Sequence, residues 1–252
     1  MAAFHEVANA IAGVPFIDRW HGRALYDHVR ESGARDVLEL GTAHGASVSY
    51  LAAAVAANGG GTVTTVDRYH FQSPTPEETL TKAGLAGKVE FVRVDHSSYS
   101  WWLKQQVQTR SDAAGNCEEA YDFVLLDGSH DWHIDGLSVI LVERLMRTGA
   151  WLALDDLDWS YERSGVERPP NLSDEEIVTP HVQDIFDVLL RPHPAFSEFR
   201  IEDGTWGWAR KAPGAARRLT IDEVRTERSI LEQRVIRAVR RARVAVRART
   251  GR

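Results

Sequence analysis

The side chains best suited to chemistry in this sequence are aspartates that follow two strand-like segments. Asp127 ends the segment YDFVLLD, with His130 three residues later, and Asp155 and Asp156 follow the segment AWLAL. Carboxylate oxygens are the ligands that Mg²⁺ and similar hard cations prefer. Three clustered carboxylates without a cation would repel one another and raise the pKa of at least one of them. The residue types therefore predict a divalent-cation site formed by Asp127, Asp155 and Asp156.

A competing interpretation is that Asp155 and Asp156 only cap a turn, while His130 packs against Trp132.

A second segment, LELGTAHGAS at residues 38–47, has the form of a nucleotide-cofactor loop. It follows a buried strand and opens a helix, with Gly41 permitting a tight turn and Gly45 a close approach of the helix. The spacing is G-x-x-x-G and not the dinucleotide pattern G-x-G-x-x-G, which argues against a nicotinamide or flavin cofactor. Asp67 ends the next strand, where a carboxylate can accept hydrogen bonds from both ribose hydroxyls.

The hydrophobic periodicity alternates between strands and helices, which predicts a doubly wound α/β sheet that positions both segments at one edge. An Asp203-Gly204 turn signal makes the last two strands an antiparallel hairpin on an otherwise parallel sheet. We expect strands at residues 36–40, 62–67, 89–94, 121–127, 150–154, 196–202 and 205–211, and helices at 17–32, 47–57, 74–83, 97–108, 136–146 and 181–190.

The cofactor loop, Asp67 and the final hairpin resemble the class I S-adenosylmethionine-dependent methyltransferases over residues 17–211. The resemblance implies a Rossmann-like sheet of seven strands and S-adenosylmethionine as the cofactor. It implies that Asp67 holds the ribose and that Asp95 or His96 lies by the adenine, although Asp95 is also a candidate helix cap. The implied cofactor-binding set is Glu39, Gly41, Thr42, Gly45, Ser47, Asp67, Asp95, His96 and Asp127.

The pattern DGSH followed by DD is similar to metal-dependent small-molecule O-methyltransferases of the catechol and antibiotic-sugar types. In those enzymes the metal binds two adjacent substrate oxygens, and a base three residues after the first aspartate removes the proton. The resemblance therefore implies that Asp127, Asp155 and Asp156 bind Mg²⁺ or a similar ion and that His130 is the catalytic base. The implied acceptor is a hydroxyl of a small molecule, a sugar or phenol of a bacterial natural product.

Two alternative functions share parts of this pattern. One is N-methyl transfer to an amino sugar, for which the metal is dispensable. The other is a metal-dependent hydroxylase of the cephalosporin-hydroxylase type, which needs a redox-active iron, but the sequence has no clear set of two histidines and one carboxylate. The mass of the product separates a gained methyl group from a gained oxygen.

The charge is distributed unevenly along the 252 residues. The whole chain has a net charge of −6, and residues 215–252 contain 12 Arg against four acidic residues, which leaves −14 for the preceding part. An acidic body argues against nucleic acid as a partner. A single cysteine, no signal-peptide pattern and no apolar stretch of membrane-spanning length predict a cytoplasmic protein without a membrane partner.

We expect four parts of the chain: an N-terminal segment (1–16), the methyltransferase domain (17–213), a substrate lid loop within it (157–180) and an Arg-rich amphipathic C-terminal helix (214–252). The N-terminal segment and the C-terminal helix are candidate elements of a homodimer. Trp159 in the lid is a candidate for stacking on the substrate. Asp131, His133 and Asp135 do not share one helical face, so we expect them to be solvated or to support the site indirectly.

Overall fold

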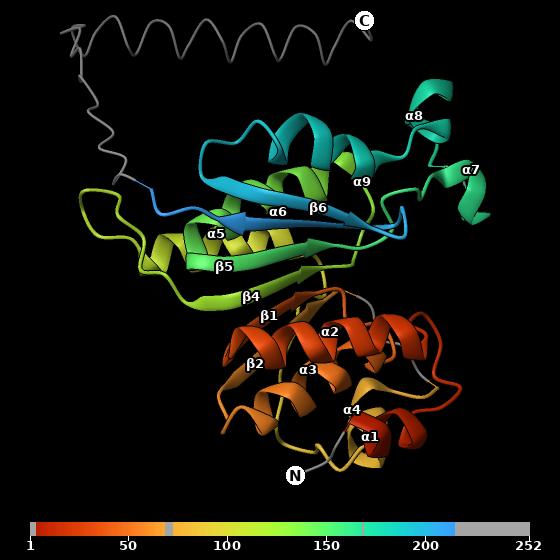
Figure 1. Ribbon diagram of the computed structural model, residues 1–252. Coiled ribbons are helices and arrows are strands. Elements are labelled where there is room, and N and C mark those ends of the chain that lie inside the picture. The colour runs from red at the N-terminus through yellow and green to blue at the C-terminus, as the bar shows by residue number, and fades with distance from the viewer. Residues whose placement is uncertain (1–3, 69–72, 168, 215–252) are drawn as a thin grey trace, which may run out of the picture. The chain divides into compact units, whose positions relative to one another are not determined.

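The computed structural model describes residues 4–68, 73–167 and 169–214, and these contain one seven-stranded sheet (Figure 1). The strand order is β3-β2-β1-β4-β5-β7-β6, with β7 antiparallel to both of its neighbours and the other pairings parallel. This confirms the doubly wound sheet with an antiparallel final hairpin. The strands are β1 (Asp36–Leu40), β2 (Thr62–Asp67), β3 (Glu90–Arg93), β4 (Tyr121–Leu126), β5 (Met146–Leu154), β6 (Phe196–Glu202) and β7 (Trp206–Lys211).

Helices cover both faces of the sheet. The helices near the N-terminus pack on one face around β1 and β2, and α5, α6 and α9 pack on the other (Figure 1). The helices are α1 (Phe4–Ala10), α2 (Arg19–Ser32), α3 (Ala46–Ala57), α4 (Pro76–Lys82), α5 (Tyr99–Arg110), α6 (Trp132–Leu145), α7 (Tyr161–Ser164), α8 (Asp174–Val178), α9 (His181–Asp184) and the π-helix η1 (Ile185–Leu190).

The buried apolar side chains form two clusters, one on each face of the sheet. Successive side chains along a strand point to opposite faces and so belong to different clusters. In β4, Phe123 and Leu125 belong to the cluster on the α1–α3 side, whereas Val124 and Leu126 belong to the cluster on the α5–α6 side. Strands buried on both faces have near-continuous apolar sequences, as β4 does. The alternation also fixes the direction of the residues that follow, so Asp127 continues the face that carries α2 and α3.

The strand register brings the ends of the central parallel strands to one level. Leu40 is opposite both Val66 and Leu126, and Leu126 is opposite Leu154. The residues that follow these strands therefore lie together at the carboxyl edge of the sheet. This edge is where ligands bind in open α/β sheets.

Several helices begin at polar caps that the sequence contains. Asp18 accepts hydrogen bonds from the backbone of the first turn of α2, and Gly33 ends that helix in the left-handed conformation. Thr75 and Glu78 form a capping box on α4. The cap at Asp18 explains why α2 begins two residues later than periodicity alone predicts.

Two elements begin four residues earlier than expected. Helix α6 begins at Trp132 and not at Gly136, because Asp131 caps it by accepting hydrogen bonds from His133 N and Ile134 N. Strand β5 begins at Met146 and not at Ala150. In both cases a tertiary or capping contact extends an element beyond its apolar pattern.

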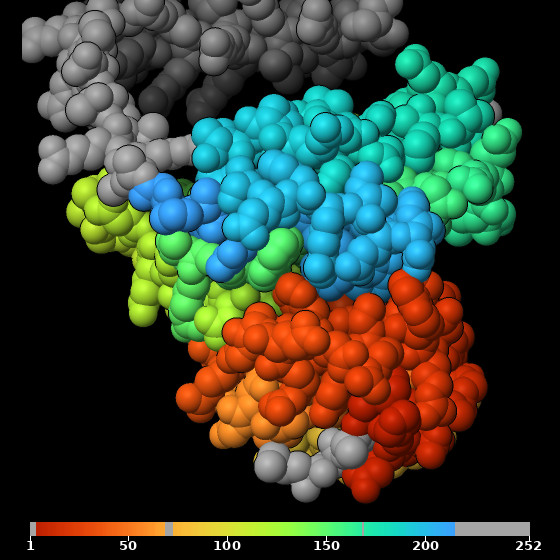
Figure 2. All heavy atoms as spheres, in the orientation of Figure 1, coloured from red at the N-terminus to blue at the C-terminus, as the bar shows by residue number. Residues whose placement is uncertain are grey.

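The connection from β5 to α9 contains α7 and α8, which project at one end of the described part (Figure 2). The N-terminal segment is part of the core, since Phe4, Val7 and Ile11 belong to the cluster around α2 and α3. None of the helices in the described residues is long and apolar enough to span a bilayer. The expected Arg-rich C-terminal helix lies outside the described residues.

Candidate active site

The cofactor loop between β1 and α3 is shaped by two glycines in left-handed backbone conformations. Gly41 has a φ of 105°, and a Cβ atom at this position would lie 1.9 Å from the backbone oxygen of Asp127. Gly45 has a φ of 81° and caps α3. Gly41 is therefore the point at which the cofactor loop crosses directly over the end of β4, and only glycine fits there.

A buried network under this loop is centred on Glu39, which is completely buried. Its carboxylate accepts hydrogen bonds from Ser47 Oγ and Thr65 Oγ1, both at 2.5 Å, and Thr65 also contacts Thr42 Oγ1 at 2.6 Å. Burial raises the pKa of Glu39 to about 8, although both hydroxyl donors oppose that rise. The side chains of Thr42 and Ser47 thus belong to this buried network.

Asp67 joins the cofactor loop to β2. Its Oδ2 atom accepts hydrogen bonds from the backbone of Thr42 at 2.8 Å and of Ala43 at 2.9 Å. Asp95 and His96 are exposed beyond the end of β3, and Asp95 pairs with Arg93. Asp95 does not cap α5, because that helix begins at Tyr99 after Ser98. The predicted cofactor residues thus lie at or near the carboxyl ends of β1, β2, β3 and β4, except Ser47, which lies in the first turn of α3.

The predicted acidic cluster lies at the same edge. Asp127, His130 and Asp156 each offer a ligand atom within 4.8 Å of the others. The Nε2 atom of His130 is 3.3 Å from Asp156 Oδ2 and 3.7 Å from Asp127 Oδ1. The described residues therefore bring together two of the three predicted metal ligands with the predicted base.

Asp155 lies beside this group but outside it. Its Oδ1 atom accepts a hydrogen bond from Asp156 N at 2.7 Å, as in the turn-capping interpretation. Burial raises the pKa of Asp155 to about 9, and the charges of Asp127 and Asp156 contribute to the rise. Burial also raises the pKa of Asp127. Three ionised carboxyl groups in this space repel one another, so a positive charge among them is favoured.

His130 is held in a conformation that is unusual for a residue with a side chain. Its φ is 54°, in the left-handed region, and its ring stacks on Trp159 at 5.1 Å. Burial by itself would lower the pKa of His130, but the contacts with Asp127 and Asp156 outweigh it and raise the pKa to about 10. The ring partner is thus Trp159 in the predicted lid, and the expected alternative of packing on Trp132 is not what the structure has.

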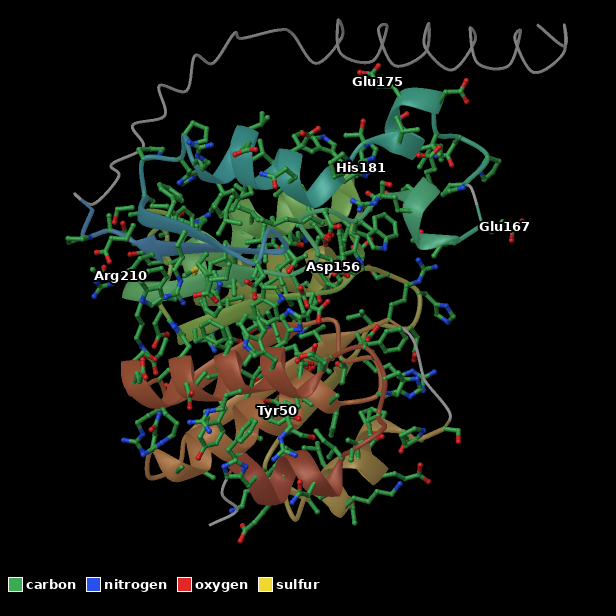
Figure 3. The ribbon with its side chains drawn as sticks, turned by 45° about the vertical axis from the view of Figure 1, so that its right-hand side comes forward. Tyr50, Asp156, Glu167, Glu175, His181 and Arg210 are labelled. Carbon is green, nitrogen blue, oxygen red and sulfur yellow. The ribbon has the colours of Figure 1, made fainter. Side chains whose placement is uncertain are left out.

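The predicted lid is anchored to α6 by hydrogen bonds of Tyr161 and of His181, a residue that sequence reasoning did not single out. His181 accepts a hydrogen bond from Trp132 N at 3.2 Å, so its other ring nitrogen carries the proton and donates to Glu176 O at 2.8 Å. Tyr161 Oη donates to Asp131 Oδ2 at 3.2 Å. The connection therefore leaves the sheet at Asp156 and returns at His181, with both ends fixed beside the acidic cluster (Figure 3).

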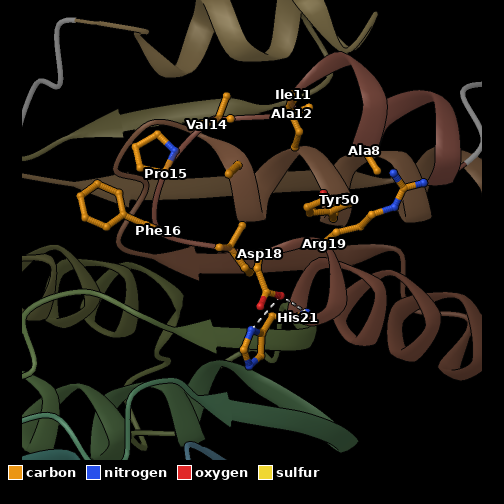
Figure 4. A pocket seen from close by; sticks show the side chains of 13 residues that line it. Ala8, Ile11, Ala12, Val14, Pro15, Phe16, Asp18, Arg19, His21 and Tyr50 are labelled. Carbon is orange, nitrogen blue, oxygen red and sulfur yellow. Dashed lines mark hydrogen bonds and ion pairs between the residues drawn. The ribbon is translucent and has the colours of Figure 1, made fainter.

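A pocket of about 640 Å³ lies beside the cofactor loop, between the segment 11–18, α1 and the first turns of α2 and α3 (Figure 4). Phe16 lines it and stacks on His44 of the cofactor loop at 5.5 Å. His21 also lines it and stacks on Trp206 at 5.5 Å, at the start of β7. The volume is in the range of small-molecule pockets. The N-terminal segment thus provides a wall next to the loop.

Of the two alternatives expected for Asp135, solvated or supporting the site indirectly, the structure excludes the solvated one. Asp135 is buried, with 1% of its surface exposed, and it accepts a hydrogen bond from the hydroxyl of Tyr99. The spacing of Asp135 to Ser138, Val139 and Val142 places it on the buried face of α6, which is a signal that periodicity offers. Tyr99 has no such signal, because its partner comes from a distant helix.

The comparisons with known proteins agree with the fold that carries this site. Residues 38–157 match the family model described as "Methyltransferase domain", a segment that runs from β1 to just beyond β5. No curated protein matches the chain in sequence.

Solved structures share the fold at low sequence identity. An O-methyltransferase from Bacillus cereus in complex with SAH is 23% identical, with a TM-score of 0.56 over 82% of this chain and 88% of that one. The O-methyltransferase TomG from Streptomyces achromogenes, in complex with SAM, is 19% identical, with a TM-score of 0.55 over 83% and 89%. The SAH-bound methyltransferase PaMTH1 from Podospora anserina is 14% identical, with a TM-score of 0.57 over 82% and 86%.

Proposed function

We propose that this chain, in which residues 38–157 are a methyltransferase domain, transfers a methyl group from S-adenosylmethionine to a hydroxyl of a small molecule. The single observation that carries the proposal is the convergence of Asp127, His130 and Asp156 at the sheet edge crossed by the cofactor loop. A donor site and an acceptor-activating site thus adjoin at Gly41. The proposed acceptor is a sugar or a phenol of a bacterial natural product.

The donor half is supported by the cofactor loop. Gly41 and Gly45 give it the left-handed backbone of a tight turn, and Asp67 fixes it through the N–H groups of Thr42 and Ala43. The similar structures from Bacillus cereus and Streptomyces achromogenes contain SAH and SAM, which supports S-adenosylmethionine as the donor here. We assign the cofactor contacts to Glu39, Gly41, Thr42, Gly45, Ser47, Asp67, Asp95, His96 and Asp127.

The residues present fit a divalent cation. Asp127 and Asp156 offer carboxylate oxygens close together, and a divalent cation beside Asp155 would oppose the rise of its pKa and favour its ionised form. We propose that Asp127, Asp155 and Asp156 hold Mg²⁺ or a similar ion. When bound, such an ion lowers the pKa of a coordinated hydroxyl by Lewis-acid polarisation.

We propose His130 as the general base. The acidic cluster holds a proton on its ring, and a base must be neutral before it accepts one. A cation on the same carboxylates would reduce their pull on this proton and lower the pKa of His130 toward neutrality. The remaining task of the protein is to align oxygen, methyl carbon and sulfur, since the sulfonium already carries its leaving group.

The experiment that tests the proposal is methyl transfer from S-adenosylmethionine to a panel of catechols and sugars, followed by product mass. We expect a gain of one methyl group on oxygen, abolished by excess EDTA and restored by Mg²⁺. Replacing His130→Ala should lower kcat by about 10²-fold or more, with binding of S-adenosylmethionine unchanged. Activity that survives EDTA would contradict the proposed need for a metal ion. Methylation on nitrogen would contradict the proposed hydroxyl acceptor, and a product that gains oxygen would contradict methyl transfer.

A further inference from the structure

Two buried polar side chains from α5 and α6 meet behind the loop that carries His130. Tyr99 begins α5 and Asp135 lies in the first turn of α6, and both are almost completely buried. The Tyr99 hydroxyl donates a hydrogen bond to Asp135 Oδ1. Burying a carboxylate costs free energy unless its partners compensate, so this pair needs an explanation beyond packing.

The explanation lies in the backbone of residues 128–130. Ser129 N donates to the Tyr99 hydroxyl oxygen at 2.7 Å, and the backbone N–H of His130 donates to the Asp135 carboxylate. Gly128 packs directly on the Tyr99 ring, since a Cβ atom there would lie 2.7 Å from Tyr99 Cε1. Three consecutive residues of the loop are therefore fixed by one tyrosine and one aspartate.

The fixed conformation is a strained one. His130 has a positive φ of 54°, a region that residues with a side chain rarely adopt. Such a conformation persists only where the surrounding contacts determine it. The same conformation directs the His130 ring toward Asp127 and Asp156.

We propose that Tyr99 and Asp135 are positioning residues, which hold residues 128–130 in the strained conformation that presents His130 to the acceptor. The proposal rests on the role of His130 proposed above. It predicts that the pair acts through His130 and not through the cofactor loop or the overall stability of the fold.

The test uses Tyr99→Phe, with Tyr121→Phe as the matched control. Tyr121 is also buried and lies at the other end of β4, away from the site. The first readout is the ¹³Cε1 NMR signal of His130 in histidine-labelled protein, assigned by its loss in His130→Ala. We expect Tyr99→Phe to shift or split this signal and Tyr121→Phe to leave it in place.

The second readout is kinetic, with 3,4-dihydroxybenzoate and Mg²⁺ as the probe acceptor system. Tyr99→Phe should lower kcat by about 10-fold or more, because misplacing a reacting group by 1 Å costs up to about 10²-fold, with KM for S-adenosylmethionine unchanged. In the His130→Ala background the same substitution should change the residual rate by less than about twofold.

Two outcomes would overturn the inference: an unmoved His130 signal in folded Tyr99→Phe, or an equal loss of rate in the His130→Ala background. Failure of the proposed function would look different, since His130→Ala would then retain the wild-type rate or the probe would not react, and the NMR comparison would still decide the positioning role. If Tyr99→Phe does not fold, Asp135→Asn takes its place in both measurements.

Discussion

At the scale of single residues, Glu39 illustrates how burial sets chemistry at this edge of the sheet. Its carboxyl group has no solvent exposure and depends on the hydroxyls of Ser47 and Thr65. Burial raises its pKa to about 8, so at neutral pH the group is mostly protonated and adds little charge beside Asp67 and Asp127. The group packed under the cofactor loop is therefore nearly uncharged, and the negative charge at this edge belongs to the aspartates.

This gives a prediction about stability and pH. The pKa of Glu39 rises from about 4.5 when exposed to about 8 in the folded protein, so the fold favours the protonated form. The wild type should therefore lose stability as pH rises from about 5 through 8, on the order of a few kcal/mol, whereas Glu39→Gln should lose less. Urea unfolding at pH 5.5 and 8.5 measures this, and equal pH dependence in both proteins would contradict it.

At the scale of elements, the crossing of the cofactor loop over the end of β4 joins the two halves of the site. Gly41 contacts the backbone oxygen of Asp127 so closely that no side chain fits between them. Asp127 N in turn donates a hydrogen bond to Leu40 O at 2.9 Å. A displacement of either segment therefore moves both the proposed donor site and the proposed acceptor site.

Gly41→Ala should abolish S-adenosylmethionine binding and destabilise the fold by more than about 2 kcal/mol, through overpacking added to backbone strain. Gly59→Ala is the matched control, because Gly59 has a similar φ of 94° but nothing within 4 Å of a Cβ atom. The control should show only the smaller cost of strain and keep cofactor binding. Calorimetric titration with S-adenosylmethionine and urea unfolding measure both effects, and equal losses in the two variants would show that strain alone is responsible.

At the scale of the whole described fold, the strand ends and the β5–α9 connection together surround the acidic cluster. Asp127 comes from β4, Asp156 follows β5, and Trp159 of the connection covers His130. A cation that binds here contacts only the folded arrangement, because the unfolded chain separates these residues. Binding should then add to the free energy of unfolding.

Thermal unfolding with and without Mg²⁺ tests this linkage. At a hundredfold excess over Kd the gain is about 2.7 kcal/mol, which raises Tm by several degrees. Asp156→Asn should abolish the rise, and Asp158→Asn should keep it, because Asp158 pairs with Arg163 outside the cluster. A rise in Tm that survives Asp156→Asn would place the ion elsewhere.

The sequence by itself determined the sheet, its final hairpin and the residues at its carboxyl edge. Periodicity is a local property, so β1, β2 and β6 have the predicted bounds, and glycine spacing identified the loop at Gly41. The family match over residues 38–157 and the similar structures agree with that fold. The local hydrophobic pattern was enough to predict these strands, because the pattern within each strand depends on which of its faces are buried.

Only the tertiary structure decided which side chains meet. The pairing of Tyr99 with Asp135 joins residues 36 positions apart, and the link from His181 to Trp132 spans 49. The grouping of His130 with Asp127 and Asp156, while Asp155 bonds to the adjacent backbone, depends on left-handed backbone conformations at His130 and Asp156. No local pattern encodes such conformations, because they arise where contacts from several elements outweigh the intrinsic preference of a residue.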